Sequence, residues 1–155
     1  MTASDNCGEC GAPQFAGARC VDCFHGLLAF ENEHPPAFGA VHHLTVASYY
    51  LQHPRGYKTE ALEMWRSAIA DSLAGRAGHR DLRRRARARF EGATRVRNAA
   101  AISPPGWPMT WPVVILDVYD PRNEPPDAAS YVERARAWAA SVISQLDEWT
   151  NAAPG

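Results

Sequence analysis

The chain has 155 residues, of which 46% are apolar and 21% are charged. These values are typical of globular domains and exclude fibrous and intrinsically disordered chains. The net charge of −1 conceals a basic segment, because residues 76–97 contain nine arginines and two carboxylates, a local charge of +7 that leaves −8 for the remainder. No apolar run reaches the about 18 residues of a membrane span, and the N-terminus lacks the regions of a secretion signal, so we expect a cytoplasmic protein without a membrane partner.

All four cysteines lie in the stretch CGECGAPQFAGARCVDC, at residues 7–23. They form two C-x2-C pairs, and a turn of this kind directs both thiolates toward one centre. The predicted metal ligands are Cys7, Cys10, Cys20 and Cys23. Gly8 and Gly11 allow the tight backbone of the first pair. In a reducing compartment such pairs are more often metal ligands than disulfides, although unligated or disulfide-bonded cysteines are an alternative.

Zinc is the metal that we expect at this site, as one structural ion. Iron is the rival, because thiolate ligands suit both metals. Four protein ligands leave no open coordination position, so the site is predicted to stabilise the N-terminal segment rather than to catalyse a reaction.

Residues 24–54 contain five of the six histidines and predict two helices. The first continues from the second cysteine pair and is ended by Pro35 and Pro36. The second runs from about Ala40 to Gln52, because apolar or small residues recur at helical spacing, and Pro54 ends it. The residues of this buried stripe are Val41, Leu44, Ser48 and Leu51.

The histidines are candidates for a second metal site or for catalysis. His42 and His53 share one stripe of the second helix but lie about 16 Å apart along its axis, so they cannot bind the same ion. Such a site therefore needs groups from elsewhere, and Glu31 and His34 are among those available. The candidate catalytic residues are His25, Glu33, His42, His43 and His53. The alternative for each histidine is a structural ring with a backbone partner, or, for His53, a position favoured by the helix dipole.

Four segments of the sequence resemble an uncharacterised bacterial family, the domain of unknown function 5946. They are the two cysteine pairs, FHGLLAFE together with HHLTVASYYLQHP, WPVVILDVYD, and the tryptophan-containing C-terminal helix. The resemblance implies no activity. It does imply a set of candidate residues to which it assigns no roles: Cys7, Cys10, Cys20, Cys23, His25, His42, His43 and His53.

Two further helices are predicted before the proline-rich region. Thr59 is expected to cap the first, which ends at Gly75 or Gly78. The second begins at His79 and has an apolar side and a basic side. The basic side forms a predicted binding patch of Arg80, Arg83, Arg84 and Arg87. This patch could bind nucleic acid or a protein, or it could be a solvated face that meets the acidic remainder of the molecule.

The C-terminal part begins with a proline-rich loop at residues 104–112. VVILDVYD follows it and predicts a short buried strand near 113–118, which needs a partner such as residues 92–97 or the cysteine segment. Ser130 and Glu133 then form a capping box at the start of an amphipathic helix. The apolar stripe of this helix is Tyr131, Ala135, Trp138, Val142, Leu146 and Trp149.

The predicted fold is mainly α, or α+β with a very small sheet. A four-cysteine zinc knuckle or ribbon at residues 1–24 packs on a domain of four to five helices at 25–155, as one cooperative unit.

The predicted function is a small zinc-binding protein that acts as a binding or regulatory module through its arginine-rich helix or its zinc knuckle. The alternative is a metalloenzyme, a hydrolase or a metal-dependent transferase, with a second metal in residues 25–53. No Walker A, GxGxxG, GxSxG or HExxH motif is present, and the choice between enzyme and binding module stays open.

Overall fold

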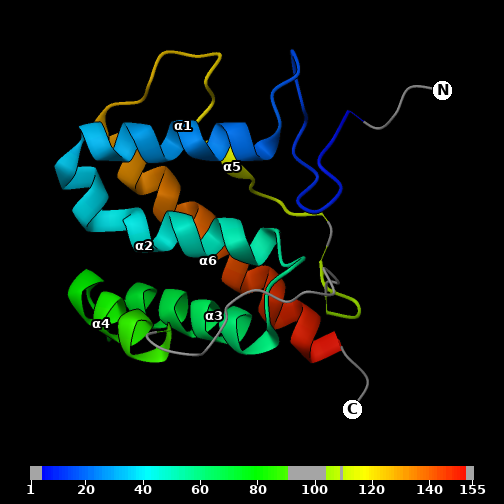
Figure 1. Cartoon of the computed structure of the whole chain (residues 1–155), viewed down its shortest axis with the longest axis vertical. Coiled ribbons are helices and arrows are strands. Elements are labelled where there is room, and N and C mark those ends of the chain that lie inside the picture. Colours follow the sequence, from blue (N-terminus) through cyan, green and yellow to red (C-terminus); the bar gives the residue numbers. More distant parts are fainter. Residues whose placement is uncertain (1–4, 91–103, 109, 153–155) are drawn as a thin grey trace.

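The structure is a computed structural model that describes residues 5–90, 104–108 and 110–152. These residues form six helices and no sheet, in agreement with the predicted mainly α class (Figure 1). The helices are α1 Cys20–Glu33, α2 Pro35–Gln52, α3 Thr59–Leu73, α4 His79–Phe90, α5 Ile115–Val118 and α6 Ala128–Ala152. No described helix combines the length and the apolar character that crossing a membrane requires.

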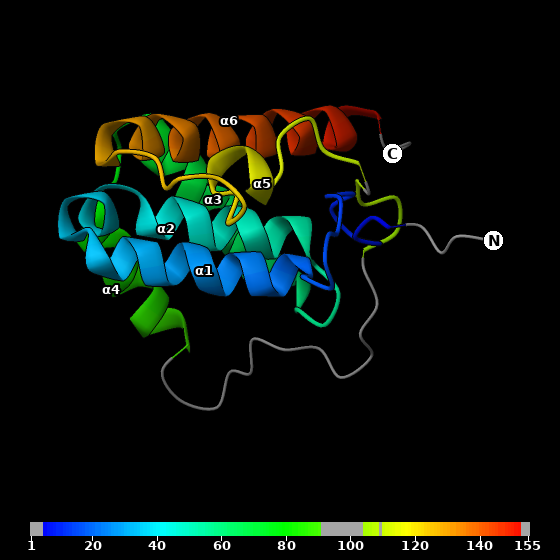
Figure 2. The same ribbon diagram turned by 90° about the horizontal axis from the view of Figure 1, so that it is seen from above.

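Helices α1 and α2 form a tight antiparallel hairpin (Figures 1 and 2). His34 is the C-cap of α1 and also the N-cap of α2. Pro35 and Pro36 end α1, as predicted, and they also occupy the first turn of α2, where the backbone N–H that proline lacks has no helical partner. Helix α2 therefore begins before the predicted Ala40.

Helix α2 is the central element of the molecule. It packs against α1, α3, α4 and α6. All four residues of its predicted stripe are buried, and so are the α6 residues Tyr131, Ala135, Trp138, Val142 and Leu146. Full burial of one large apolar side chain stabilises a fold by about 1.5–3 kcal/mol. Because α2 and α6 bury many such side chains against each other, their contact forms the main part of the core.

Helices α3 and α4 complete the bundle on the other side of α2. Thr59 is the first residue of α3, whose N-cap is Lys58. Arg66 of α3 donates hydrogen bonds to Asp147 and Thr150 of α6, at 2.5 and 2.8 Å. This contact fixes the far end of α6 against α3.

The predicted strand near 113–118 is wrong, because Ile115–Val118 form the short helix α5. A single strand would leave its backbone groups unpaired, whereas a helical turn pairs them locally. Val114 N–H donates to the Asp117 carboxylate at 2.8 Å, and Tyr119 N–H donates to the Ile115 carbonyl at 2.9 Å. Buried Ile115 and Val118 then lie one turn apart and pack α5 between α1 and α6. The suggested partner segment 92–97 lies outside the described residues.

Candidate metal centre

The first cysteine pair forms a tight turn at the surface of the helical body. Gly11 N–H donates to the Cys7 carbonyl at 2.9 Å, and Cys7 N–H donates to the Ala12 carbonyl at 2.8 Å. Gly11 has a φ of 77°, a conformation that glycine adopts without strain. Ala12 N–H points at the Cys10 sulfur, at 3.4 Å. The turn therefore holds both thiols on one side and already gives the Cys10 sulfur a backbone donor.

The second cysteine pair is not a second turn of this kind. CVDC forms the first turn of α1, with Cys20 as the first helical residue. The thiol of Cys20 is buried and lies 3.3 Å from the sulfur of Cys10. The start of a helix thus supplies the third sulfur of the group.

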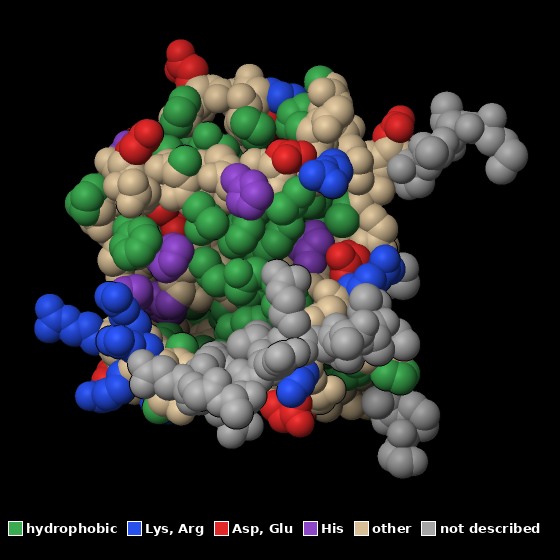
Figure 3. All heavy atoms as spheres, in the orientation of Figure 1, with side chains coloured by type: hydrophobic (Ala, Val, Ile, Leu, Met, Phe, Trp, Pro, Cys, Tyr) green, Lys and Arg blue, Asp and Glu red, His purple; other side chains and the backbone are tan. Residues whose placement is uncertain are grey.

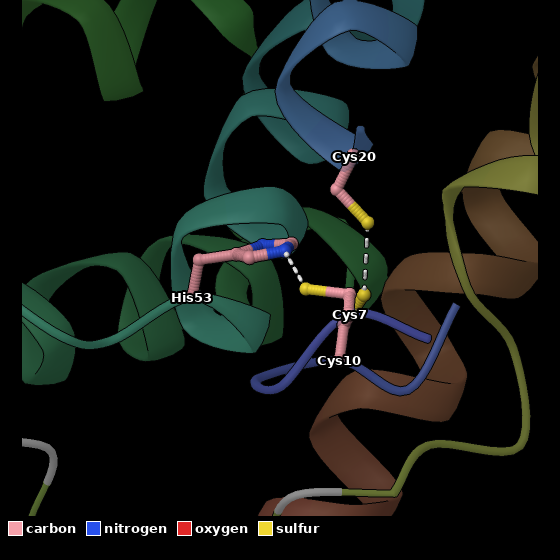
Figure 4. Close-up of side chains that lie close together, drawn as sticks. All are labelled: Cys7, Cys10, Cys20 and His53. Atoms are coloured by element: carbon pink, nitrogen blue, oxygen red, sulfur yellow. Dashed lines mark hydrogen bonds between the residues drawn. The ribbon is translucent and has the colours of Figure 1, made fainter. Parts of the chain in front are cut away.

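His53 supplies the fourth donor atom of the group, from the C-cap of α2. Its Nε2 lies 3.5 Å from the Cys7 sulfur, and its ring points toward the three thiols (Figure 4). Its Nδ1 donates to the Tyr49 carbonyl at 2.8 Å. This backbone contact holds a ring proton on Nδ1 and directs Nε2 at the thiols, which is the usual support for a metal-binding histidine.

The four donor atoms fit a single tetrahedral ion. The sulfur atoms of Cys7, Cys10 and Cys20 and a ring nitrogen of His53 all lie within 4.8 Å of one another. Metal–sulfur bonds of about 2.3 Å in a tetrahedron place two sulfur atoms roughly 3.8 Å apart, which is close to the spacing seen here. Cys3His is also one of the regular donor sets of structural zinc sites.

The protonation of these groups is strongly linked. Hydrogen bonds from the Cys10 and Cys20 thiols lower the pKa of Cys7, whereas contacts with Cys10 and Cys7 raise the pKa of Cys20. Burial is the largest single effect on His53 and opposes its protonation, but the contacts with Cys10, Cys7 and the Tyr49 carbonyl together outweigh it and raise the pKa of His53 to about 10. Three neighbouring thiols in a buried site cannot all ionise without a counter-charge, and a divalent cation supplies that charge.

Cys23, the fourth predicted ligand, does not belong to this group of donor atoms. It is buried one turn into α1, where burial and the nearby charges of Asp120 and Asp22 raise its thiol pKa. Of the second pair, only Cys20 has its sulfur in the group of mutually close donor atoms, and the fourth donor of that group is His53.

The register of the α1–α2 hairpin explains why His53 reaches Cys20. Phe24, four residues after Cys20, stacks on Tyr49, four residues before His53, with ring centroids 3.9 Å apart. Seven residues further along each helix, Glu31 and His42 are hydrogen-bonded at 2.6 Å. One antiparallel register thus aligns all three pairs and brings the end of α2 to the start of α1.

The other predicted site residues lie elsewhere. His25 and Glu33 are exposed. His34 bonds the Phe30 carbonyl at 2.8 Å, which is the structural alternative given above. His42 pairs with the fully buried Glu31, and His43 Nε2 lies 2.8 Å from the Ser72 hydroxyl.

The arginines of the predicted binding patch, Arg80, Arg83, Arg84 and Arg87, are all exposed on α4. Arg84 is paired with Asp81 of the same helix at 2.8 Å. The patch is therefore an exposed basic surface of α4.

The role of His53 beside the cysteines was not predicted. Its spacing to Cys20 has no motif, because the two meet only through the hairpin. The available signal was the pair of prolines after His34, which predicts a tight turn between two helices and hence an antiparallel return of His53 toward Cys20.

Comparison with known proteins gives a family but no activity. No curated protein and no solved structure matches the chain. The model of a family of unknown function, DUF5946, matches residues 5–147, which include all four donors of the candidate metal centre. The protein is therefore a member of DUF5946.

Proposed function

We propose that this protein is a zinc-dependent binding module in which one structural zinc ion is held by Cys7, Cys10, Cys20 and His53. The observation that carries the proposal is the convergence of three thiols and one correctly oriented imidazole at the start of α1 and the end of α2. Zinc is favoured over iron because three thiolates and one histidine form a common structural zinc set. Four protein ligands leave no position for a substrate, so the ion stabilises the fold.

The alternative of a second metal site in residues 25–53 has less support. His25 and Glu33 are exposed, and His42 is held by Glu31. Within the described ranges, the Cys3His set is the only group of potential ligands whose donor atoms lie within reach of one another.

Elemental analysis of protein purified without added metal tests the zinc proposal. We expect one zinc per chain in the wild type, in Cys23→Ser and in the His42→Ala, His43→Ala double variant, and its loss in His53→Ala. Cys23→Ser is the matched control, because it removes a buried thiol of the same helical turn. Loss of zinc from Cys23→Ser but not from His53→Ala would restore the four-cysteine site and contradict the proposal.

A spectroscopic measurement covers the case in which His53→Ala does not fold. The visible absorption of Co²⁺-loaded wild-type protein depends on the number of thiolate ligands. Three sulfur ligands are expected, and the spectrum of Cys23→Ser should be unchanged. A four-thiolate spectrum that changes in Cys23→Ser would contradict the proposed donor set.

The proposed binding surface is the exposed arginine patch of α4, and its partner is a negatively charged nucleic acid or protein. Arg80 and Arg84 can be reversed to Glu, with the same two changes at exposed Arg134 and Arg136 of α6 as a control for net charge. Fluorescence anisotropy with a DNA duplex should show binding that weakens steeply between about 50 and 200 mM salt and is lost only in the α4 variant. Absence of binding to DNA would leave an acidic protein as the partner, and equal loss in both variants would contradict a role of α4.

A further inference from the structure

A cavity of about 450 Å³ lies between α2, α3 and α4, away from the metal centre. Its apolar wall includes Phe38, Val46, Met64, Trp65 and Leu82. This volume is within the range of small-molecule sites, which are typically apolar with a few polar groups. Figure 3 shows histidine side chains beside apolar surface and next to a group of basic side chains. The cavity therefore combines an apolar wall with polar and positive groups.

The first polar group of the cavity is His42, whose orientation is fixed from behind by Glu31. The Glu31 carboxylate is fully buried and accepts hydrogen bonds from His42 Nδ1 at 2.6 Å, from Thr45 at 2.7 Å and from Tyr131 at 2.5 Å. A carboxyl group in the core needs such partners. The His42 ring lines the cavity, and its Nε2 makes no hydrogen bond within the described residues. Residues of α1, α2 and α6 thus fix the His42 ring and leave its Nε2 available to a ligand.

His43 and His79 supply two more ring nitrogens. Both rings line the cavity, with centroids 5.5 Å apart. The Nδ1 atom of each is buried and has no hydrogen-bond partner in the described part of the chain. Buried polar atoms in folded proteins are generally paired, so these two unpaired nitrogens mark the histidine side of the cavity as its polar end.

Positive charge at the cavity comes from α4. Arg83 and Arg85 both line it. Arg85 is paired with Asp71 at 2.6 Å, whereas Arg83 has no carboxylate partner among the described residues and is exposed. A guanidinium is well suited to oxyanions, because its donors match two oxygen atoms of a carboxylate or phosphate group.

We propose that this cavity binds a small organic oxyanion, with an apolar body against the apolar wall and its charged group at Arg83 and the histidines. Phe38 already stacks on the His42 ring, with centroids 4.2 Å apart, so flat groups fit this part of the protein. This site goes beyond the zinc proposal and is independent of it, because His43 lies about 15 Å along α2 from His53.

Calorimetric titration of the zinc-loaded full chain tests the proposal with three probes that share one ring: phenyl phosphate, benzoate and the neutral benzyl alcohol. We expect saturable binding of at least one anion and at least about tenfold weaker binding of the alcohol, since a charge-assisted hydrogen bond is lost. Phenyl phosphate and benzoate distinguish a phosphate from a carboxylate ligand. No saturable binding of either anion, or equal binding of the alcohol, would overturn the proposal.

Substitutions of residues that line the cavity test whether the anion binds there. Arg83→Gln should weaken binding about tenfold or more, and Ala68→Phe should abolish it by filling the cavity. Arg134→Gln is the control, because Arg134 is exposed on α6, does not line the cavity, and its loss changes net charge equally. Equal effects of Arg83→Gln and Arg134→Gln would refute the site. Zinc content and circular dichroism confirm that each variant is folded.

Discussion

His43 shows how burial changes the charge of a single side chain in this bundle. Burial is the main cause that lowers its pKa from 6.5 to about 4, and the positive charges of His79, His42 and Arg136 lower it further, against a raising effect of Glu31. His43 is therefore neutral at pH 7. In the unfolded chain it becomes protonated below pH 6.5, whereas in the folded protein it resists protonation down to about pH 4.

Acid should consequently destabilise the protein through His43. Between pH 6.5 and 4 the unfolded state binds the extra proton, so the stability that neutral His43 contributes above pH 6.5 is lost as the pH falls. The loss attributable to this residue is up to about 3 kcal/mol. Urea unfolding at pH 7 and pH 4.5 should show a smaller decrease in His43→Gln than in the wild type. An identical decrease in both proteins would assign the acid sensitivity to other groups.

At the scale of elements, the close contact of α1 with α5 depends on Gly26. A Cβ atom at this position would lie 3.1 Å from the Tyr119 ring, whereas at Gly39 of α2 nothing lies within 4 Å. We expect Gly26→Leu to destabilise the protein by about 1–3 kcal/mol, because the larger side chain must displace Tyr119. Gly39→Ala should stabilise it by about 1 kcal/mol through helix propensity. Denaturant unfolding measures both changes, and stabilisation by Gly26→Leu would show that α5 is not held tightly.

The helices and their buried faces were largely predictable, because periodicity is a local signal. The predicted stripes of α2 and α6 are buried, apart from the half-buried Trp149 at the end of α6. The same apolar run that makes a strand also makes a short buried helix, and the wrong prediction at 113–118 reflects that ambiguity.

The candidate site was only partly predictable, because its completion depends on pairs that lie far apart in the sequence. Cys7 and Cys10 form a local turn that their spacing indicates. The pairing of Cys20 with His53, and of Glu31 with His42, arises from the register of two helices, which no spacing rule gives. The cavity combines three helices and has no linear signature.

At the scale of the whole molecule, the metal centre and the helical body should unfold together. Cys10, Ala12 and Cys20 belong to the same buried cluster as the helices, and Glu9 accepts a hydrogen bond from Arg55 N–H at 3.0 Å. Removal of the proposed metal with a chelator should lower the midpoint of one thermal transition by on the order of 10 °C. Differential scanning calorimetry with and without chelator measures the shift. Two separate transitions would show that the segment and the helical body unfold independently.

The contact between Cys7 and His53 joins residues 46 positions apart, so an ion at the proposed centre would close a long loop of the chain. Such a closure restricts the unfolded ensemble much as a disulfide does, by roughly 4 kcal/mol for a loop of this length. Unlike a disulfide, it is set by mass action, and its contribution grows with the logarithm of free metal concentration. The lifetime of this protein against unfolding and proteolysis would then follow the supply of metal.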